Sequence, residues 1–186
     1  MKLLKGVYFM SKKVLISFSG RGSGNCARIA EFLSDRMDDA QVFRFSDFQI
    51  EPCGNCDCEC LKGGSCPKHD METSLMDAVC GSNEAWFIVP NYCGFPCADL
   101  FIYNERSVGY FGGSRQRMEQ YMAVPKRFVL IGNGSQENFL RAFKQHTSEE
   151  PKILQLQSRE FQVSSIAGDL IDQQEVQNRL IQFLQG

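Results

Sequence analysis

The chain has 186 residues, of which 43% are hydrophobic and 23% charged, a composition typical of a globular protein that can bury its own core in one domain. Its formal net charge of −2 excludes a basic surface that would attract nucleic acid or anionic lipid. No apolar run approaches the ~20 residues that a bilayer span needs, and the opening residues MKLLKGVYFMSKK lack the features of a secretory signal. We therefore expect a cytoplasmic protein that contacts neither nucleic acid nor membrane, with Met1 and Met10 both available as its first residue.

Short apolar runs alternate with helical patterns along the chain. Five runs predict strands, at residues 13–18, 40–45, 84–89, 126–131 and 152–156, and Pro90 is expected to stop the third. Apolar residues at helical spacing predict helices within 26–37, 75–79, 97–124, 139–143 and 176–184, with a break at Gly112 and Gly113. Strands that alternate with helices predict an α/β protein with a parallel sheet covered on both faces. We find no linker and expect a single domain over residues 1–186, with a cysteine-rich insert at about 50–70.

The loop after the first predicted strand has the composition of an anion site. It reads SGRGSGN and places Ser19, Arg21, Ser23, Gly24 and Asn25 before a helix. Glycines let the backbone approach an anion, the helix start attracts negative charge, and an arginine adds a bidentate donor. The loop lacks the Gly-Lys-Ser/Thr of nucleotide hydrolases and the sixth-position glycine of the dinucleotide fingerprint. A Gly/Ser-rich turn that merely caps a helix is the alternative.

Two further loops are predicted at the same edge of the sheet. In a sheet of order 2-1-3-4-5 the first and third strands are neighbours, so their loops line one crevice. The loop after the third strand contains Pro90, Asn91, Tyr92, Cys93 and Gly94. The loop after the fourth strand contains Gly132 and Asn133. A planar ligand with a phosphate tail fits this geometry, with Tyr92 stacking or donating a hydrogen bond, or serving only as a loop anchor.

These motifs, in this order, resemble the NADPH-dependent FMN reductase family and the related iron–sulfur flavoproteins. Residues 16–27, ISFSGRGSGNCA, are similar to the family opening I-x-G-S-P-R-x-x-G-N-T, and residues 89–94, VPNYCG, are similar to S-P-V-Y-W/F-G. The stretch 52–71 resembles the cysteine-rich insert of the same group. The similarity spans roughly residues 13–135.

The resemblance implies a flavodoxin-like three-layer sandwich, with a five-stranded parallel sheet of order 2-1-3-4-5, that holds FMN. It implies that Ser19, Arg21, Asn25 and Cys26 bind the phosphate and that residues 90–94 contact the isoalloxazine. The chain also departs from the family pattern, with Phe18 for glycine, Gly20 for proline, Cys26 for threonine, and Asn91 and Cys93 in the second loop. A thiol is a weaker donor than a hydroxyl, so the departure at position 26 predicts weaker phosphate binding.

Nine cysteines are unusual for such a chain, and five of them fall between residues 53 and 66. The odd total and the expected compartment argue against a framework of disulfides. Four thiolates suit an iron–sulfur cluster, and the resemblance implies a four-iron four-sulfur centre with Cys53, Cys56, Cys60 and Cys66 as ligands and Cys58 as the alternative. Zinc, free thiols and disulfides remain alternatives. Because the insert leaves the second strand at the crevice edge, a cluster there is expected to exchange electrons with FMN, within one chain or across a subunit contact.

The sequence thus predicts an NAD(P)H-dependent, FMN-binding oxidoreductase that passes electrons to a flavin, quinone, cluster or redox protein, with no residue identified as a general base. The alternatives are a non-catalytic flavodoxin-like electron carrier and a metal-binding relative that has lost FMN. Aromatic residues gather after the second loop, and they predict either core packing or a homo-oligomer interface over the flavin: Phe95, Phe101, Tyr103, Tyr110 and Phe111.

Overall fold

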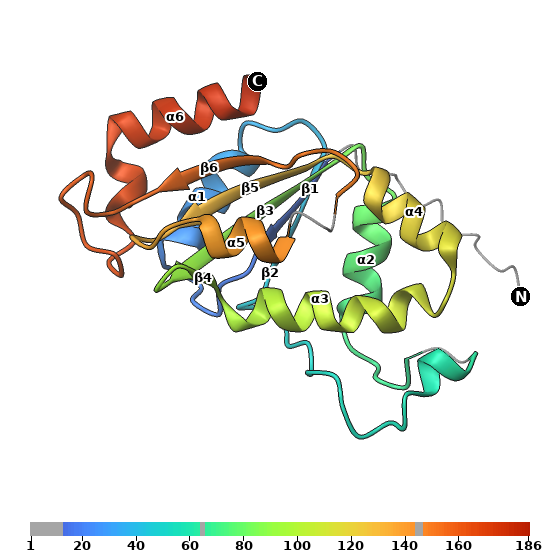
Figure 1. The fold of residues 1–186 in the computed structure, drawn as a ribbon. Coiled ribbons are helices and arrows are strands. Elements are labelled where there is room, and N and C mark those ends of the chain that lie inside the picture. Colours follow the sequence, from blue (N-terminus) through green and yellow to red (C-terminus); the bar gives the residue numbers. More distant parts are fainter. Residues whose placement is uncertain (1–12, 64–65, 144–146) are drawn as a thin grey trace, which may run out of the picture.

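The computed structural model describes residues 13–63, 66–143 and 147–186, so both candidate first residues, Met1 and Met10, lie outside the described part. A single sheet runs through its centre, with helices on both faces (Figure 1). Within the described ranges, no helix is long and apolar enough to pass through a membrane.

Five parallel strands form the sheet in the order β2-β1-β3-β5-β6, which confirms the predicted order of five parallel strands. Their bounds are β1 Lys13–Ser17, β2 Ala40–Arg44, β3 Glu84–Tyr92, β5 Lys126–Ile131 and β6 Lys152–Leu156. A short sixth strand, β4 Phe95–Pro96, pairs antiparallel with the end of β3 and was not predicted.

Pro90 does not stop the third strand, contrary to expectation. It lies inside β3 and is in register with Ile131 of β5. Proline lacks only the N–H group, and its carbonyl still accepts a hydrogen bond from the Cys97 amide at 3.0 Å. The strand therefore continues to Tyr92 and turns back through Cys93 and Gly94, whose positive φ values of 51° and 86° suit a tight hairpin turn.

The helices lie close to the predicted positions. Their bounds are α1 Asn25–Ser34, α2 Glu72–Cys80, α3 Ala98–Phe111, α4 Arg115–Ala123, α5 Glu137–Phe143 and α6 Gln174–Gln185, with single 3₁₀ turns η1 Glu59–Lys62 and η3 Asp169–Asp172. The expected break falls at Gly112 and Gly113, both at positive φ. Glycine adopts this conformation without the steric cost of a Cβ, so the chain can end α3 and begin α4 at once.

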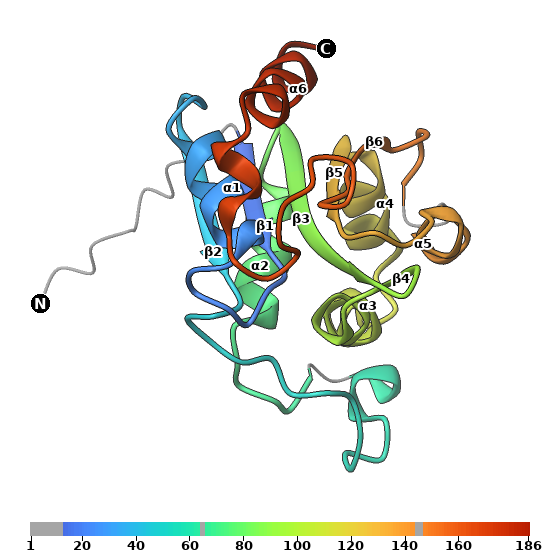
Figure 2. The same cartoon turned by 90° about the vertical axis from the view of Figure 1, so that its left-hand side faces the viewer.

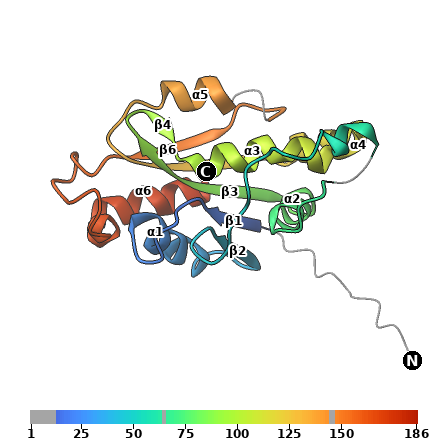
Figure 3. The same ribbon diagram turned by 90° about the horizontal axis from the view of Figure 1, so that it is seen from below.

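Two apolar layers enclose the sheet, as a parallel sheet requires. Alternate residues of each central strand face opposite layers: Val14 and Ile16 pack with α2 to α5, whereas Leu15 packs with α1, η3 and α6. Figure 3 shows α1 and α6 on one side of the strands and α3 and α5 on the other. The resulting three-layer sandwich brings the carboxyl ends of all five parallel strands to one edge.

The cysteine-rich insert leaves β2 and extends away from that edge (Figures 1 and 2). It passes below α3 and returns to the layer at the start of α2. The predicted position of the insert in the chain is thus correct, but its cysteines do not lie at the crevice.

Candidate functional site

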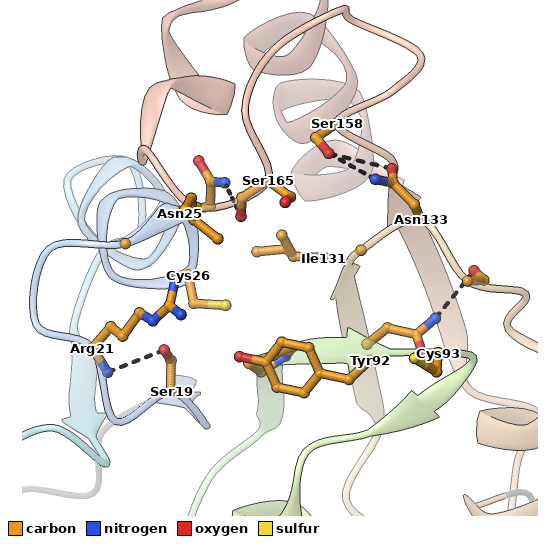
Figure 4. Close-up of a pocket in the computed structure, with 16 residues that line it drawn as sticks. Ser19, Arg21, Asn25, Cys26, Tyr92, Cys93, Ile131, Asn133, Ser158 and Ser165 are labelled. Carbon is orange, nitrogen blue, oxygen red and sulfur yellow. Dashed lines mark hydrogen bonds between the residues drawn. The ribbon is translucent and has the colours of Figure 1, made fainter.

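A pocket of about 420 Å³ opens at the carboxyl ends of β1, β3, β5 and β6 (Figure 4). It gathers residues from all three predicted loops and from the segment after β6: Ser19, Arg21, Gly24, Asn25, Cys26, Pro90, Asn91, Tyr92, Cys93, Ile131, Gly132, Asn133, Gly134, Ser158, Ser165 and Ile166. Among the predicted cofactor-binding residues, only Ser23 and Gly94 are not in this lining. The structure thus brings the predicted loops together, while the ligand contacts of each residue stay predictions.

The first loop presents donors and a cation at one end of the pocket. Helix α1 begins after Gly24, and no side chain in the described structure caps its first turn, so its free N–H groups point towards the loop. Ser19 accepts a hydrogen bond from the Arg21 amide at 3.3 Å, which shapes the turn. The exposed Arg21 side chain forms no ion pair with any described residue and can meet an anion.

The thiol of Cys26 lies in this end of the pocket and is neutral. Burial, followed by the nearby Cys97 thiol, raises the pKa of Cys26 to about 12. Cys97 donates a hydrogen bond from its own thiol to the Phe18 carbonyl at 3.0 Å. The Cys26 thiol therefore brings no negative charge against a phosphate at neutral pH.

Phe18 supports the loop from inside the core. Its side chain is fully buried and packs on Phe45, Phe87 and Tyr103, with ring centroids 4.8 to 5.5 Å apart. Phe18, where the similar motif has glycine, therefore fills the core beneath the loop instead of blocking the pocket.

The second and third loops touch each other closely on the opposite side. Asn91 donates from its amide to the carbonyls of Gly134 at 3.2 Å and Ser135 at 3.3 Å, and Gln155 of β6 bonds the Gly132 and Gly134 carbonyls. A Cβ at Gly132 would lie 2.1 Å from the Asn91 carbonyl oxygen, and one at Gly134 would lie 2.2 Å from the Gly94 nitrogen. Only glycine fits at these two positions, so the wall is held by backbone contact.

Tyr92 lies across the pocket between the two ends. Its ring lies between Ser19 and Cys93 in Figure 4, with the hydroxyl towards Ser19. The side chain is 58% exposed, and burial raises its pKa above the usual value. A neutral, accessible ring in this position can stack on a planar ligand or donate to it.

The sequence analysis missed the wall formed by the segment after β6, which contributes Ser158, Ser165 and Ile166. Its position after a predicted strand was a usable signal, because every loop at the carboxyl edge of a parallel sheet borders the crevice. Asn25 is buried and holds this wall: its amide donates to the Ser165 carbonyl at 3.2 Å and accepts from the Leu170 amide at 3.0 Å. This side chain, predicted for phosphate, is thus already engaged in two hydrogen bonds.

Two cysteines of the insert, Cys60 and Cys66, lie beside the second half of α3. A Cβ on Gly109 would be 3.0 Å from the Cβ of Cys66 and 4.0 Å from that of Cys60, so the bare backbone of the helix leaves room for both. Burial raises the pKa of Cys53, and Glu105 and the thiols of Cys56, Cys60 and Cys66 contribute. All nine cysteines are free. In the described residues, no three His, Cys, Asp or Glu side chains are arranged to hold a metal ion, so the ligand set stays a prediction.

A buried arginine closes the neck of the insert. Arg106 of α3 is 2% exposed and donates to the Glu51 carbonyl at 2.6 Å and to both carboxylate oxygens of Asp70 at 2.7 and 3.1 Å. Residues at the two ends of the insert thus meet on one guanidinium. Hydrogen bonds from Arg106, Glu51 and Glu72 lower the pKa of Asp70 and keep it ionised despite partial burial.

The expected electron exchange between insert and pocket is not supported within one chain. Cys97, just before α3, bonds the end of β1, whereas the insert contacts α3 at Gly109. At 1.5 Å per residue, these twelve residues of helix separate the two regions by about 18 Å. The aromatic residues after the second loop also divide: Tyr103 and Tyr110 belong to the core, whereas Phe95 and Phe101 are exposed.

Comparison with known proteins supports the fold. No protein-family model and no curated protein matches the sequence. Among solved structures, Trp repressor binding protein from Bacillus subtilis is similar with a TM-score of 0.64 at 13% identity, over 93% of this chain and 97% of that one. FerB, a flavoenzyme NAD(P)H:(acceptor) oxidoreductase from Paracoccus denitrificans, is similar with a TM-score of 0.53 at 10% identity, over 93% of this chain and 94% of FerB. The apo form of EMOB, an NADH:FMN oxidoreductase, is similar with a TM-score of 0.51 at 15% identity, over 92% of this chain and 87% of EMOB.

Proposed function

With a flavodoxin-like fold established, we propose that this protein is an NAD(P)H-dependent oxidoreductase that binds FMN in the pocket at the carboxyl edge of its sheet. The pocket carries the proposal, because it joins an uncapped helix start and a single guanidinium at one end to a slot between glycine-rich loops at the other. No carboxylate lines it among the described residues. The similarity in fold to FerB, a flavoenzyme NAD(P)H:(acceptor) oxidoreductase, and to EMOB, an NADH:FMN oxidoreductase, supports the same proposal.

The residues present fit a flavin monophosphate. Arg21, Ser19 and the first amides of α1 would bind the phosphate, and the backbone of residues 90–94 and 132–134 would hold the ring. When bound, FMN supplies hydride and electron transfer at its ring, and the protein supplies orientation and electrostatics. The neutral thiol of Cys26 and the absence of a lining carboxylate keep negative charge away from the phosphate.

An affinity comparison tests the phosphate end. Arg21→Ala should weaken FMN binding by roughly 10- to 100-fold, because it removes a hydrogen bond between charged groups, and should leave riboflavin binding unchanged. Arg115→Ala is the matched control, since the Arg115 side chain is 86% exposed and forms an ion pair with Glu119 on α4. Flavin fluorescence titration measures both. Equal loss for FMN and riboflavin would contradict the proposed orientation.

An activity assay separates the enzyme from the carrier. Steady consumption of NAD(P)H with free FMN or a quinone as acceptor supports the reductase. Reduction that occurs only with a redox protein identifies a flavodoxin-like carrier instead. We propose a homo-oligomer as well, with the exposed aromatic residues Phe95 and Phe101 in its interface.

We also propose that the insert holds an iron–sulfur cluster on Cys53, Cys56, Cys60 and Cys66. The supporting observations are that all four thiols belong to one insert and that Cys60 and Cys66 both lie beside the same glycine of α3. Thiolates are the ligands such clusters use. Iron and acid-labile sulfide should be present in protein purified without oxygen. Zinc alone, or no metal, would reject this part and leave the flavin site untouched.

A further inference from the structure

The segment after β6, residues 157–172, is fixed to the phosphate loop as firmly as the other walls of the pocket. Arg28 of α1 donates to the Gly168 carbonyl at 2.6 Å and pairs with Asp172 at 2.6 Å. A Cβ on Gly168, at φ 85°, would lie 2.9 Å from the Ser23 carbonyl oxygen, so the two loops meet backbone to backbone. Together with the Asn25 bonds to Ser165 and Leu170, these contacts place the segment before any ligand arrives.

Within this segment, Ser158 is a buried hydroxyl that lines the pocket. It is 4% exposed and lies beside Asn133 of the third loop (Figure 4). The Asn133 amide nitrogen is 3.0 Å from the Ser158 oxygen, and the Asn133 amide oxygen accepts from the Arg159 N–H at 3.1 Å. Because the Arg159 N–H needs an acceptor, the amide orientation is set, and Asn133 donates to Ser158.

This arrangement leaves the hydrogen of the Ser158 hydroxyl available. Among the described residues, its one acceptor is the Asn133 amide oxygen, at a longer 3.3 Å, and that oxygen already accepts from the Arg159 N–H. A buried donor without a full-strength partner gains free energy when a ligand supplies an acceptor. Ser158 also lies across the pocket from the phosphate loop, on the side of the third loop.

We propose that the Ser158 hydroxyl, oriented by Asn133, donates a hydrogen bond to an acceptor atom on the isoalloxazine ring, and so fixes the ring from the C-terminal wall. The inference rests on the proposed flavin function and deepens it. It adds a residue that binds the ring and that lies in none of the three sequence motifs. The ligand class is a planar heterocycle with carbonyl oxygens or unprotonated nitrogens at its edge.

The test is a binding comparison across two ligands. Ser158→Ala should weaken the binding of FMN and of riboflavin by the same factor, since both ligands carry the isoalloxazine ring. We expect a factor of roughly 5 to 10 for the loss of one buried hydrogen bond. Ser158→Thr keeps the hydroxyl and should retain binding. Ser164→Ala is the matched control, because Ser164 is exposed in the same segment and outside the pocket lining. Thermal melts of each variant report whether the fold is intact.

The outcomes separate this inference from the proposed function. The inference is supported if Ser158→Ala loses the same factor in affinity for both ligands and Ser158→Thr retains the native affinity. If the native protein binds FMN and Ser158→Ala binds both ligands as tightly, or loses FMN alone, Ser158 does not contact the ring and the inference is overturned. If Ala melts far below the native protein, the Thr variant decides: its failure to bind despite a native melting temperature overturns the inference. If the native protein binds neither FMN nor riboflavin, the proposed function itself fails.

Discussion

The pocket and the cysteine-rich insert are both rich in chemically active side chains, but they are held in opposite ways. In the pocket, glycines bring backbones into contact, and the amides of Asn25, Asn91 and Gln155 bind neighbouring loops. In the insert, the five cysteines are free, and Arg106 closes only the neck. A site built from backbone contacts is ordered before its ligand binds, whereas thiols on a loop are brought into a ligand set by the metal itself.

The largest expected effect comes from the backbone contact in the pocket. Gly134→Ala places a Cβ 2.2 Å from the Gly94 nitrogen, so the two loops must separate. We expect a loss of about 2–4 kcal/mol in the free energy of unfolding, together with loss of FMN binding. Gly20→Ala is the control, because nothing lies within 4 Å of a Cβ there. Urea denaturation of both variants measures the difference, and equal stability would contradict a pocket held by backbone packing.

The neck of the insert should respond to pH. Burial raises the pKa of Glu72, at the start of α2, from the usual 4.5 to about 7. Between these values the folded chain keeps a proton that the unfolded chain releases, so stability falls as pH rises from about 4.5 to 7 and the penalty is complete above that. Relative to the native protein, the free energy of unfolding of Glu72→Gln should therefore rise by about 1–3 kcal/mol between pH 5 and pH 8.

The measurement is chemical denaturation of both proteins at the two pH values. Glu59→Gln, an exposed site in the insert, is the control and should show no such gain. An unchanged difference between native protein and Glu72→Gln at pH 5 and pH 8 would show that Glu72 ionises as freely in the folded protein as in the unfolded chain.

A smaller effect tests how the insert docks on α3. Alanine normally stabilises a helix by about 1 kcal/mol relative to glycine. The Cβ of an alanine at position 109 would lie 3.0 Å from the Cβ of Cys66, so the insert must shift. This shift should cancel the gain in stability that alanine gives the helix. We expect Gly109→Ala to leave FMN binding intact while Cys60 and Cys66 react faster with a thiol reagent. Val108→Ala, on the exposed side of α3, should not change their reactivity. A simple gain in stability with unchanged labelling would contradict the docking.

The smallest effect concerns the thiol at the phosphate end. A hydroxyl is a better donor than a neutral thiol, so Cys26→Ser should tighten FMN binding by roughly two- to fivefold without changing riboflavin binding. Cys80→Ser, outside the pocket lining, is the control. Weaker FMN binding in Cys26→Ser would show that position 26 does not face the phosphate.

The sequence predicts most of the fold because its signals are local. Buried apolar runs and helical spacing place the parallel strands and the helices, and the two glycines at 112 and 113 mark the break between α3 and α4. The continuation of β3 through Pro90 escapes such reasoning, because the carbonyl of Pro90 finds its partner in Cys97, beyond the turn.

The sequence predicts the parts of the site that lie in loops directly after strands. It misses the parts whose position depends on contacts between residues far apart in the chain. The three predicted loops converge, as their positions after strands indicate. Ser158 belongs to no recognisable motif, and its proposed role depends on Asn133, which lies 25 residues earlier in the chain. The placement of the insert depends on Gly109 and Arg106, whose meaning appears only when α3 and the insert lie together.

Equilibrium titration of the intact native protein with FMN and with riboflavin, followed by flavin fluorescence, tests the central claim most directly. The account predicts saturable, equimolar binding of both ligands, with FMN tighter by roughly 10- to 100-fold because Arg21 and the start of α1 meet its phosphate. Absence of binding by both, or equal affinity for the two ligands, would contradict a flavin phosphate site in this pocket.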